Sequence, residues 1–284
     1  MAMTESPVVK PLSLSNEGDL EIVFIGTGNA FAKRLFQTNF LLIKGDTHVL
    51  VDFGMTGPQA LREVAGLECT DIRTILPTHS HADHIGGVEY LTLINRYVAV
   101  ATLGRAKLNM IIHDEYRPVL WEMSLRGGLE FNEESHDGQR LDFADLYNEH
   151  SLEVLSNGPR RILRTNFGGI NIELFHTNHI PGEATTPADA FITYGLMVDD
   201  RVFISGDTKF DRELIDLYAD RSEVMFHDAA FSYNPVHAST PELRTLPEHI
   251  RKKMYLMHYP DSYESHDVSD FAGYAQQGVR YRFP

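Results

Sequence analysis

The sequence has few of the residues on which several common architectures depend. It holds one cysteine, Cys69, so no disulfide can form within the chain, and this fits a reducing compartment such as the cytoplasm. We expect Cys69 to be a small, half-buried apolar residue rather than a nucleophile. No apolar run approaches the roughly 18 residues that a membrane span needs. The first 18 residues also have neither the basic start nor the apolar stretch of a secretory signal peptide.

Basic residues are outnumbered by acidic ones. The chain has 25 Lys and Arg against 40 Asp and Glu, a formal net charge of −15. This balance disfavours binding of a long nucleic acid, which depends on many cationic contacts to phosphate. A small phosphorylated substrate stays open, since bound divalent cations can supply positive charge locally. Histidine is plentiful, with 14 residues, several of them in short clusters.

The 284 residues suit one large domain. We expect a polar tail over 1–19 and a single domain over 20–284. An insertion or lid is expected at about 113–150, because Trp121, a Gly-Gly pair and an acidic run lie there; an ordinary surface loop with a helix is the alternative. Apolar runs predict strands at 21–25, 40–43, 48–51, 73–76, 161–164, 171–175, 191–198, 202–205, 224–227 and 254–257. Helices are predicted at 58–65, 86–94, 212–218 and 241–252.

Four candidate metal ligands lie within six residues, directly after the strand predicted at 73–76. They are His79, His81, Asp83 and His84. In an extended loop His79 and His81 point the same way, and Asp83 and His84 follow at the start of a helix. Imidazole and carboxylate ligands suit zinc, manganese or iron, and the absence of thiolates argues against a closed structural zinc site.

Further candidate ligands follow the later predicted strands. Asp207 closes the strand at 202–205, His258 closes the strand at 254–257, and His176 and His179 follow the strand at 171–175. Taken alone, each would more often be a capping Asp or an ordinary core or surface His. Together with the first cluster, they are enough to complete two coordination spheres.

The order of these motifs resembles that of metallo-β-lactamase-fold hydrolases, over about residues 21–259. The resemblance implies a four-layer αββα sandwich of the α/β (α+β) class. The ribonuclease Z-like branch is the better match, through residues 24–28, 51–54, 227–231 and 237–240. It implies two divalent ions, zinc first and manganese as the alternative. One ion would take His79, His81 and His179, the other Asp83, His84 and His258, with Asp207 bridging and His176 as the runner-up to His179.

The resemblance also implies roles in hydrolysis of a phosphodiester. His237 would protonate the leaving oxygen, and Asp83 would orient the attacking water or receive its proton. A surface His near a helix start is the plainer interpretation of His237. Asp52 and Asp228 are expected to support the ligands from behind.

The substrate is expected to be small. The transfer RNA processing enzymes of this branch carry a long Gly-rich arm, and only the 27 residues 180–206 separate His179 from Asp207. Residues 120–129 are similar to an insertion in the anti-Pycsar phosphodiesterases, homodimers that hydrolyse cyclic mononucleotides. Base-stacking candidates are the aromatic residues Trp121 and Tyr233, followed by Tyr116 and Phe131; each is more often a core residue.

Three alternatives remain open at this stage. They are a ribonuclease Z-like RNA endonuclease, a thioesterase or lactonase with the same metal pair, and a metal-binding scaffold without turnover. The preferred hypothesis is a cytoplasmic, homodimeric, metal-dependent cyclic nucleotide phosphodiesterase.

Overall fold

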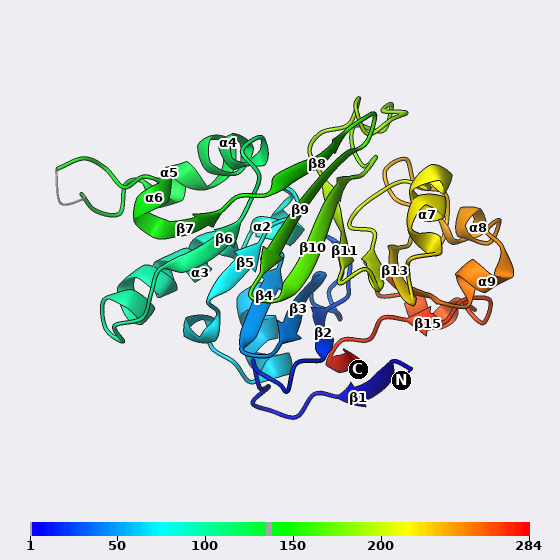
Figure 1. Ribbon diagram of the computed structural model, residues 1–284, viewed down its shortest axis with the longest axis horizontal. Helices are drawn as coiled ribbons and strands as arrows, with labels where there is room; N and C mark the ends of the chain where they lie inside the picture. The colour runs from blue at the N-terminus through cyan, green and yellow to red at the C-terminus, as the bar shows by residue number, and fades with distance from the viewer. Residues whose placement is uncertain (1, 135–137) are drawn as a thin grey trace. The chain divides into compact units, whose positions relative to one another are not determined.

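The computed structural model describes residues 2–134 and 138–284 (Figure 1). The chain forms two compact units. Unit 1 comprises residues 1–26, 38–152 and 278–284, and unit 2 comprises residues 27–37 and 153–277. Each unit contains one mixed eight-stranded sheet. In the described part of the chain, no helix is long and apolar enough to cross a membrane.

The sheet of unit 1 is ordered β1-β16-β2-β3-β4-β5-β6-β7. Its middle strands are apolar and buried throughout, as β2 with the sequence LEIVFIG shows. Strands β4, β5, β6 and β7 run parallel to one another. The bounds are β1 (Thr4–Pro7), β2 (Leu20–Gly26), β3 (Asn39–Lys44), β4 (Thr47–Val51), β5 (Thr74–Leu76), β6 (Leu108–Ile111), β7 (Tyr147–His150) and β16 (Val279–Phe283).

The helices of unit 1 are short. Their bounds are α1 (Gly57–Ala60) with η1 (Leu61–Ala65), η2 (Cys69–Asp71), α2 (Ala82–Ile85), α3 (Val88–Ile94) with η3 (Asn95–Val100), α4 (Tyr116–Leu120) with η4 (Trp121–Leu125), α5 (Arg126–Leu129) and α6 (Phe143–Leu146). Segment 113–150, expected as an insertion, therefore holds α4 to α6 and β7; its residues 135–137 lie outside the described residues. The N-terminal segment, expected as a polar tail, contributes the exposed edge strand β1, which pairs with β16. Cys69 is buried, and burial raises the pKa of its thiol to about 12, which fits a structural residue.

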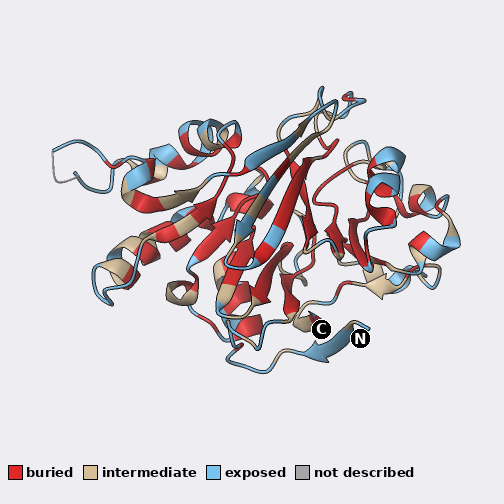
Figure 2. Ribbon diagram, in the orientation of Figure 1, coloured by how far each residue is buried: buried red, intermediate tan, exposed pale blue. Residues whose placement is uncertain are grey.

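The sheet of unit 2 is ordered β15-β14-β13-β12-β11-β10-β9-β8. Strands β12 to β15 are parallel, and β8 to β12 are antiparallel. Figure 2 shows β10, β11 and β13 as largely buried. The bounds are β8 (Glu153–Asn157), β9 (Arg161–Phe167), β10 (Ile170–His176), β11 (Tyr194–Val198), β12 (Val202–Ile204), β13 (Val224–Asp228), β14 (Met254–Met257) and β15 (Gly273–Tyr274).

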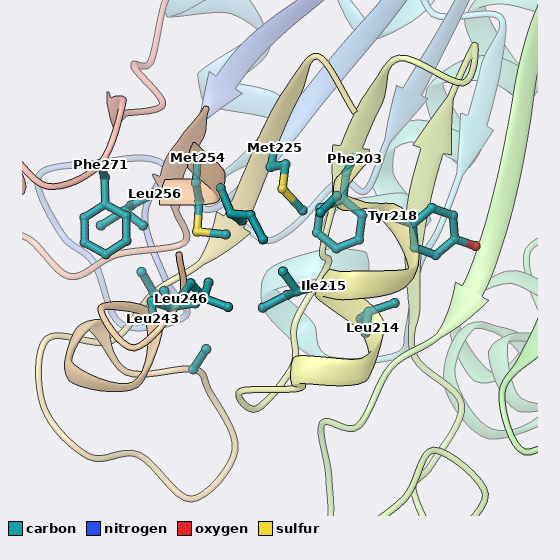
Figure 3. Packing of buried hydrophobic residues seen from close by; sticks show 14 of the residues in the cluster. Phe203, Leu214, Ile215, Tyr218, Met225, Leu243, Leu246, Met254, Leu256 and Phe271 are labelled. Carbon is teal, nitrogen blue, oxygen red and sulfur yellow. The ribbon is translucent and has the colours of Figure 1, made fainter. Parts of the chain in front are cut away.

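Helices α7 (Arg212–Ala219), α8 (Thr240–Leu243) and α9 (Glu248–Arg251) belong to unit 2, as does the short turn η5 (Tyr263–Ser265). The Asp211 carboxylate caps α7 by accepting the backbone N–H of Leu214 at 2.9 Å. Figure 3 shows apolar side chains of α7 and α8 against those of β12, β13 and β14. This core fixes the strands whose ends carry Asp207, Asp228 and His258.

The predicted strands are confirmed, apart from boundary shifts and a later start of β11 at Tyr194. The single helix predicted over 241–252 is wrong, because the structure has α8 and α9 instead. Pro247 is the N-cap of α9, and a proline disfavours helical geometry in the residue before it. The break lets Leu246 turn into the core.

A buried histidine in unit 1 predicts a pH-dependent loss of stability. His48 on β4 is 6% exposed, and its Nε2 accepts the backbone N–H of Arg73 at 3.0 Å. Burial, and then the charge of Arg73, lower the pKa of His48 to about 4. The unfolded chain, with a His pKa of about 6.5, therefore binds the proton first as the pH falls. Between about pH 8 and about pH 5.5 this group should remove about 1.4 kcal/mol of unfolding free energy.

The measurement is urea unfolding of the wild-type protein and of His48→Gln at both pH values, with His249→Gln at an exposed histidine as the control. His48→Gln should lose less stability on acidification than the other two proteins. Equal losses in all three would rule out His48 as the group that titrates.

Candidate functional site

The histidine-rich loop of unit 1 brings its four candidate ligands close together. The ring centroid of His79 lies 4.6 Å from that of His81 and 4.1 Å from that of His84. Asp83 Oδ2 lies 3.4 Å from His84 Nε2. His79, Asp83 and His84 are buried, whereas His81 is half-buried at the N-cap of α2. We call these four residues the first half-site.

Asp52 supports the first half-site from the end of β4. Since β4 and β5 are parallel neighbours, Asp52 lies beside the residues that follow β5. Its carboxylate accepts the backbone N–H of Thr78 at 2.7 Å and the Thr78 hydroxyl at 2.8 Å, and lies 2.7 Å from His84 Nδ1. The backbone of Asp52 is left-handed, with φ 59°. Burial raises the pKa of the Asp52 carboxyl, and His84 opposes that rise.

The second half-site lies in unit 2 and comprises His179, which follows β10, and Asp207 and His258, which follow the parallel strands β12 and β14. Asp207 Oδ2 lies 3.8 Å from His179 Nε2 and 3.6 Å from His258 Nε2. All three side chains are buried. The parallel strands β12, β13 and β14 bring their carboxyl ends to one edge of the sheet, which explains why Asp207 and His258 meet although they lie far apart in the chain.

A glycine lets the chain turn into Asp207. Gly206 has φ +59°, and a Cβ there would lie 2.3 Å from the carbonyl oxygen of Tyr194. An L side chain would therefore be strained and would also clash with the backbone of β11. This close approach holds Asp207 directly after β12.

His179 and His176 have different surroundings. His179 Nδ1 lies 2.8 Å from the carbonyl oxygen of Val236, and its Nε2 faces Asp207. Burial lowers the pKa of His179 to about 4, which favours the neutral imidazole. The ring of His176, at the end of β10, lies 5.0 Å from that of Tyr194. The contacts that hold His179 are long-range, so its Val236 partner was not identifiable from the sequence.

Lys209 is a supporting residue that sequence reasoning missed. Its Nζ donates to the carbonyl oxygens of Pro181, Gly182 and Ala184 at 3.0, 2.8 and 2.6 Å. These bonds fix the loop that follows His179 to the segment that follows Asp207. A lysine two residues after a candidate ligand has no motif of its own, so only the fold reveals this contact.

Asp228 contacts two histidines from the end of β13. Its Oδ2 lies 2.6 Å from His237 Nδ1, and its Oδ1 lies 3.4 Å from His258 Nδ1. It also accepts the backbone N–H of Thr208 at 3.1 Å. Burial disfavours the charged forms of Asp228 and His237. The attraction between these two side chains nevertheless holds the pKa of Asp228 below its ordinary value and that of His237 above it.

Four of the candidate ligand histidines share an arrangement that suits metal binding. The Nδ1 atom of His79 lies 3.1 Å from Thr78 Oγ1, and that of His84 lies 2.7 Å from Asp52 Oδ2. The Nδ1 atom of His179 lies 2.8 Å from the Val236 carbonyl oxygen, and that of His258 lies 3.4 Å from Asp228 Oδ1. A partner at Nδ1 orients the ring and leaves Nε2 as the ligating atom. Within each unit these imidazoles lie beside buried carboxylates, a combination of donors that divalent metals accept.

The aromatic substrate-binding candidates lie in different environments. Trp121 is 7% exposed and packs its ring edge-on to Phe143, with centroids 6.0 Å apart. Tyr116 is buried, and its hydroxyl lies 3.1 Å from Ser80 Oγ in the histidine-rich loop. Phe131 is exposed beneath the Arg140 guanidinium. Tyr233 is 81% exposed.

Comparison with known proteins places the chain in a family. The family model described as anti-Pycsar protein Apyc1 matches residues 20–281. The chain belongs to the anti-Pycsar Apyc1 family. The anti-Pycsar protein Apyc1 of Bacillus phage BSP38 is 35% identical over 247 residues, which cover 86% of this chain and 90% of that protein. The anti-Pycsar protein Apyc1 of Paenibacillus xerothermodurans is 33% identical, with coverage of 93% and 98%.

Solved structures show which fold this family member has. The metallo-β-lactamase fold protein YhfI from Bacillus subtilis has a TM-score of 0.65 at 16% identity, and the match covers 93% of this chain and 100% of that one. Human tRNase Z, short form, has a TM-score of 0.60 at 16% identity, with coverage of 91% and 98%. The chain therefore has the metallo-β-lactamase fold, as the sequence motifs predicted.

Proposed function

We propose that this protein is a metal-dependent phosphodiesterase that hydrolyses a cyclic nucleotide. Two divalent ions, zinc first and manganese as the alternative, would be held by both half-sites. One ion would take His79, His81 and His179, the other Asp83, His84 and His258, and Asp207 would bridge them. The proposal also includes a single domain over residues 20–284, a homodimer and a cytoplasmic location.

The observation that carries the proposal is the orientation of the ligand histidines. Rings held at Nδ1 keep their Nε2 atoms in place before any metal binds, so little side-chain entropy is lost on binding. A closed structural zinc site usually has thiolate ligands, and the candidate ligands include none. The donor set instead suits an open catalytic site.

The bound ions would generate a hydroxide near neutral pH and offset the charge of the phosphodiester. Side chains of the protein would orient the attacking water and transfer the protons. Asp83, buried beside His84, would orient the attacking water or accept its proton. His237 would give a proton to the leaving oxygen from Nε2, because Asp228 holds Nδ1 at 2.6 Å. Asp52 and Asp228 act as positioning residues behind the ligands.

Two observations support a small substrate. The 27 residues 180–206 are occupied by a loop and by β11 and β12, which leaves no room for a long arm. The net charge of −15 disfavours a long polyanion. The relatives named above are anti-Pycsar proteins, and a cyclic nucleotide signal is the small phosphodiester that we propose.

The test is a hydrolysis panel with added zinc or manganese. It contains cyclic AMP, cyclic GMP, cyclic CMP and cyclic UMP, together with a short RNA, a thioester and a lactone. We expect turnover of at least one cyclic nucleotide and its loss in His81→Ala. Faster cleavage of RNA, the thioester or the lactone would favour the corresponding alternative. Tightly held metal without hydrolysis of any ester would indicate a metal-binding scaffold.

His237 gives a second prediction within the proposed function. His237→Ala should keep its bound metal and lower kcat by roughly 10²–10⁴-fold, the usual contribution of a general acid. Metal analysis and steady-state kinetics on the same preparation measure both quantities. A His237→Ala protein with full metal content and wild-type turnover would refute the assignment of the acid.

A further inference from the structure

A cavity of about 320 Å³ lies within unit 2 beside His237 and His258. Its size falls at the lower end of the range for small-molecule sites. The loops after β13 and β14 form most of its wall, and Asn29 completes it. The cavity therefore adjoins both a candidate ligand and the proposed acid, while most of its lining has no part in the proposed chemistry.

One wall of the cavity is a planar aromatic pair. Phe231 and His266 stack face to face, with ring centroids 3.9 Å apart and an interplanar angle of 10°. Tyr274 holds the pair from behind. Its ring meets Phe231 edge-on at 6.2 Å, and its hydroxyl donates to the carbonyl oxygen of His266 at 3.2 Å. A supported flat pair of this kind is a stacking surface for a planar ligand.

The polar part of the wall offers neutral hydrogen-bond donors. Asn29 Oδ1 accepts the backbone N–H of Phe31 at 3.1 Å, and Asn234 Oδ1 accepts those of Val236 and His237 at 3.0 and 3.1 Å. With the oxygens engaged, each carboxamide retains its NH₂ group as a donor. Ser232 and Ser262 add hydroxyls.

The charges of the lining bear on the type of ligand. Among the described residues, neither lysine nor arginine lines this cavity, and its one carboxylate, Asp228, is bonded to His237. A second phosphate would find neither lysine nor arginine to bind here. A neutral, planar group rich in hydrogen-bond acceptors meets both the aromatic wall and the donors.

We propose that this cavity binds the base of the cyclic nucleotide, with Phe231 and His266 as its stacking platform. The inference rests on the proposed function, since it places the base beside the phosphodiester that His237 would protonate. Base specificity is then set by Asn234, in the loop after β13, and by Asn29, which follows β2.

The test separates binding from turnover. Binding of a phosphorothioate analogue of cyclic AMP is measured by calorimetry for the wild-type protein, Phe231→Leu, Phe231→Trp and the surface control His249→Ala, with metal content and thermal melting as checks on folding. Loss of stacking in Phe231→Leu should raise Kd by roughly 10-fold or more. Phe231→Trp and His249→Ala should bind like the wild type.

Kinetics on cyclic AMP and on an abasic ribose cyclic phosphate complete the experiment. Phe231→Leu should raise KM for cyclic AMP and leave the abasic substrate unaffected. If the wild type turns over cyclic AMP while Phe231→Leu binds and reacts normally, the cavity assignment is wrong and the proposed function stands. If the analogue binds in a Phe231-dependent manner without turnover of any cyclic nucleotide, the cavity stands and the function fails. No binding and no turnover overturns both.

Discussion

Replacement of Asp207 by alanine is expected to abolish hydrolysis and to release metal. In the proposed site this carboxylate bridges both ions, and its Oδ2 already lies 3.8 Å from His179 Nε2 and 3.6 Å from His258 Nε2. Loss of a supporting residue behind a metal ligand typically costs 10–100-fold. Loss of a shared ligand should cost more, roughly 10³-fold or more in kcat/KM.

The loss of metal in Asp207→Ala is measured by the metal content per chain and by the metal-dependent rise in Tm. The loss of activity is measured by hydrolysis of cyclic nucleotides. Ligands that bind the folded state raise Tm, so added zinc should stabilise the wild-type protein and stabilise Asp207→Ala far less. Asp216→Ala, at an exposed residue of α7, is the matched control. Asp207→Ala with two tightly bound ions and normal turnover would contradict the bridging role.

The second large effect is expected at Asp228. This side chain is fully buried and lies 2.6 Å from His237 Nδ1 and 3.4 Å from His258 Nδ1. Asp228→Asn keeps the shape but replaces an acceptor with an NH₂ donor, so the His237 ring is no longer held in the required tautomer. In a Ser-His-Asp catalytic triad the same change of the Asp lowers kcat by about 10⁴-fold. We expect a fall of roughly 10²–10⁴-fold here, mainly in kcat rather than KM.

A double-mutant cycle tests whether Asp228 acts through His237. If it does, the double variant His237→Ala/Asp228→Asn should be barely slower than His237→Ala alone, because residues that act as a unit are not additive. Far-UV circular dichroism and melting confirm that each variant is folded. Strictly additive losses would show that Asp228 acts mainly through His258 or through the fold.

Local patterns predicted most of the strands near the candidate site. Apolar runs such as VFI in β12 and VMF in β13 are short and bounded by polar residues, and burial on both faces makes them apolar throughout. The edge strands β1 and β8 were not predicted. They are exposed and lack an apolar pattern, and pairing with β16 and β9 is what defines them.

The helix predicted over 241–252 was wrong for a related reason. Apolar residues recur at helical spacing on both sides of Pro247, so the apolar pattern alone favours one continuous helix. The proline imposes a break there, and burial of Leu246 stabilises it.

The sequence by itself determined the chemistry of the candidate ligands and their positions after predicted strands, because residue type and strand periodicity are local properties. It also determined the family, through the order of the motifs. Tertiary structure decided which atom of each histidine is held. His179 meets the Val236 carbonyl 57 residues away, and His84 meets Asp52 across 32 residues. Parallel pairing of β4 with β5 brings Asp52 beside the loop that holds His84, and loops far apart in the chain bring the Phe231–His266 pair and Asn29 around one cavity. Such groupings depend on which strands become neighbours in the folded chain, and no local pattern encodes that.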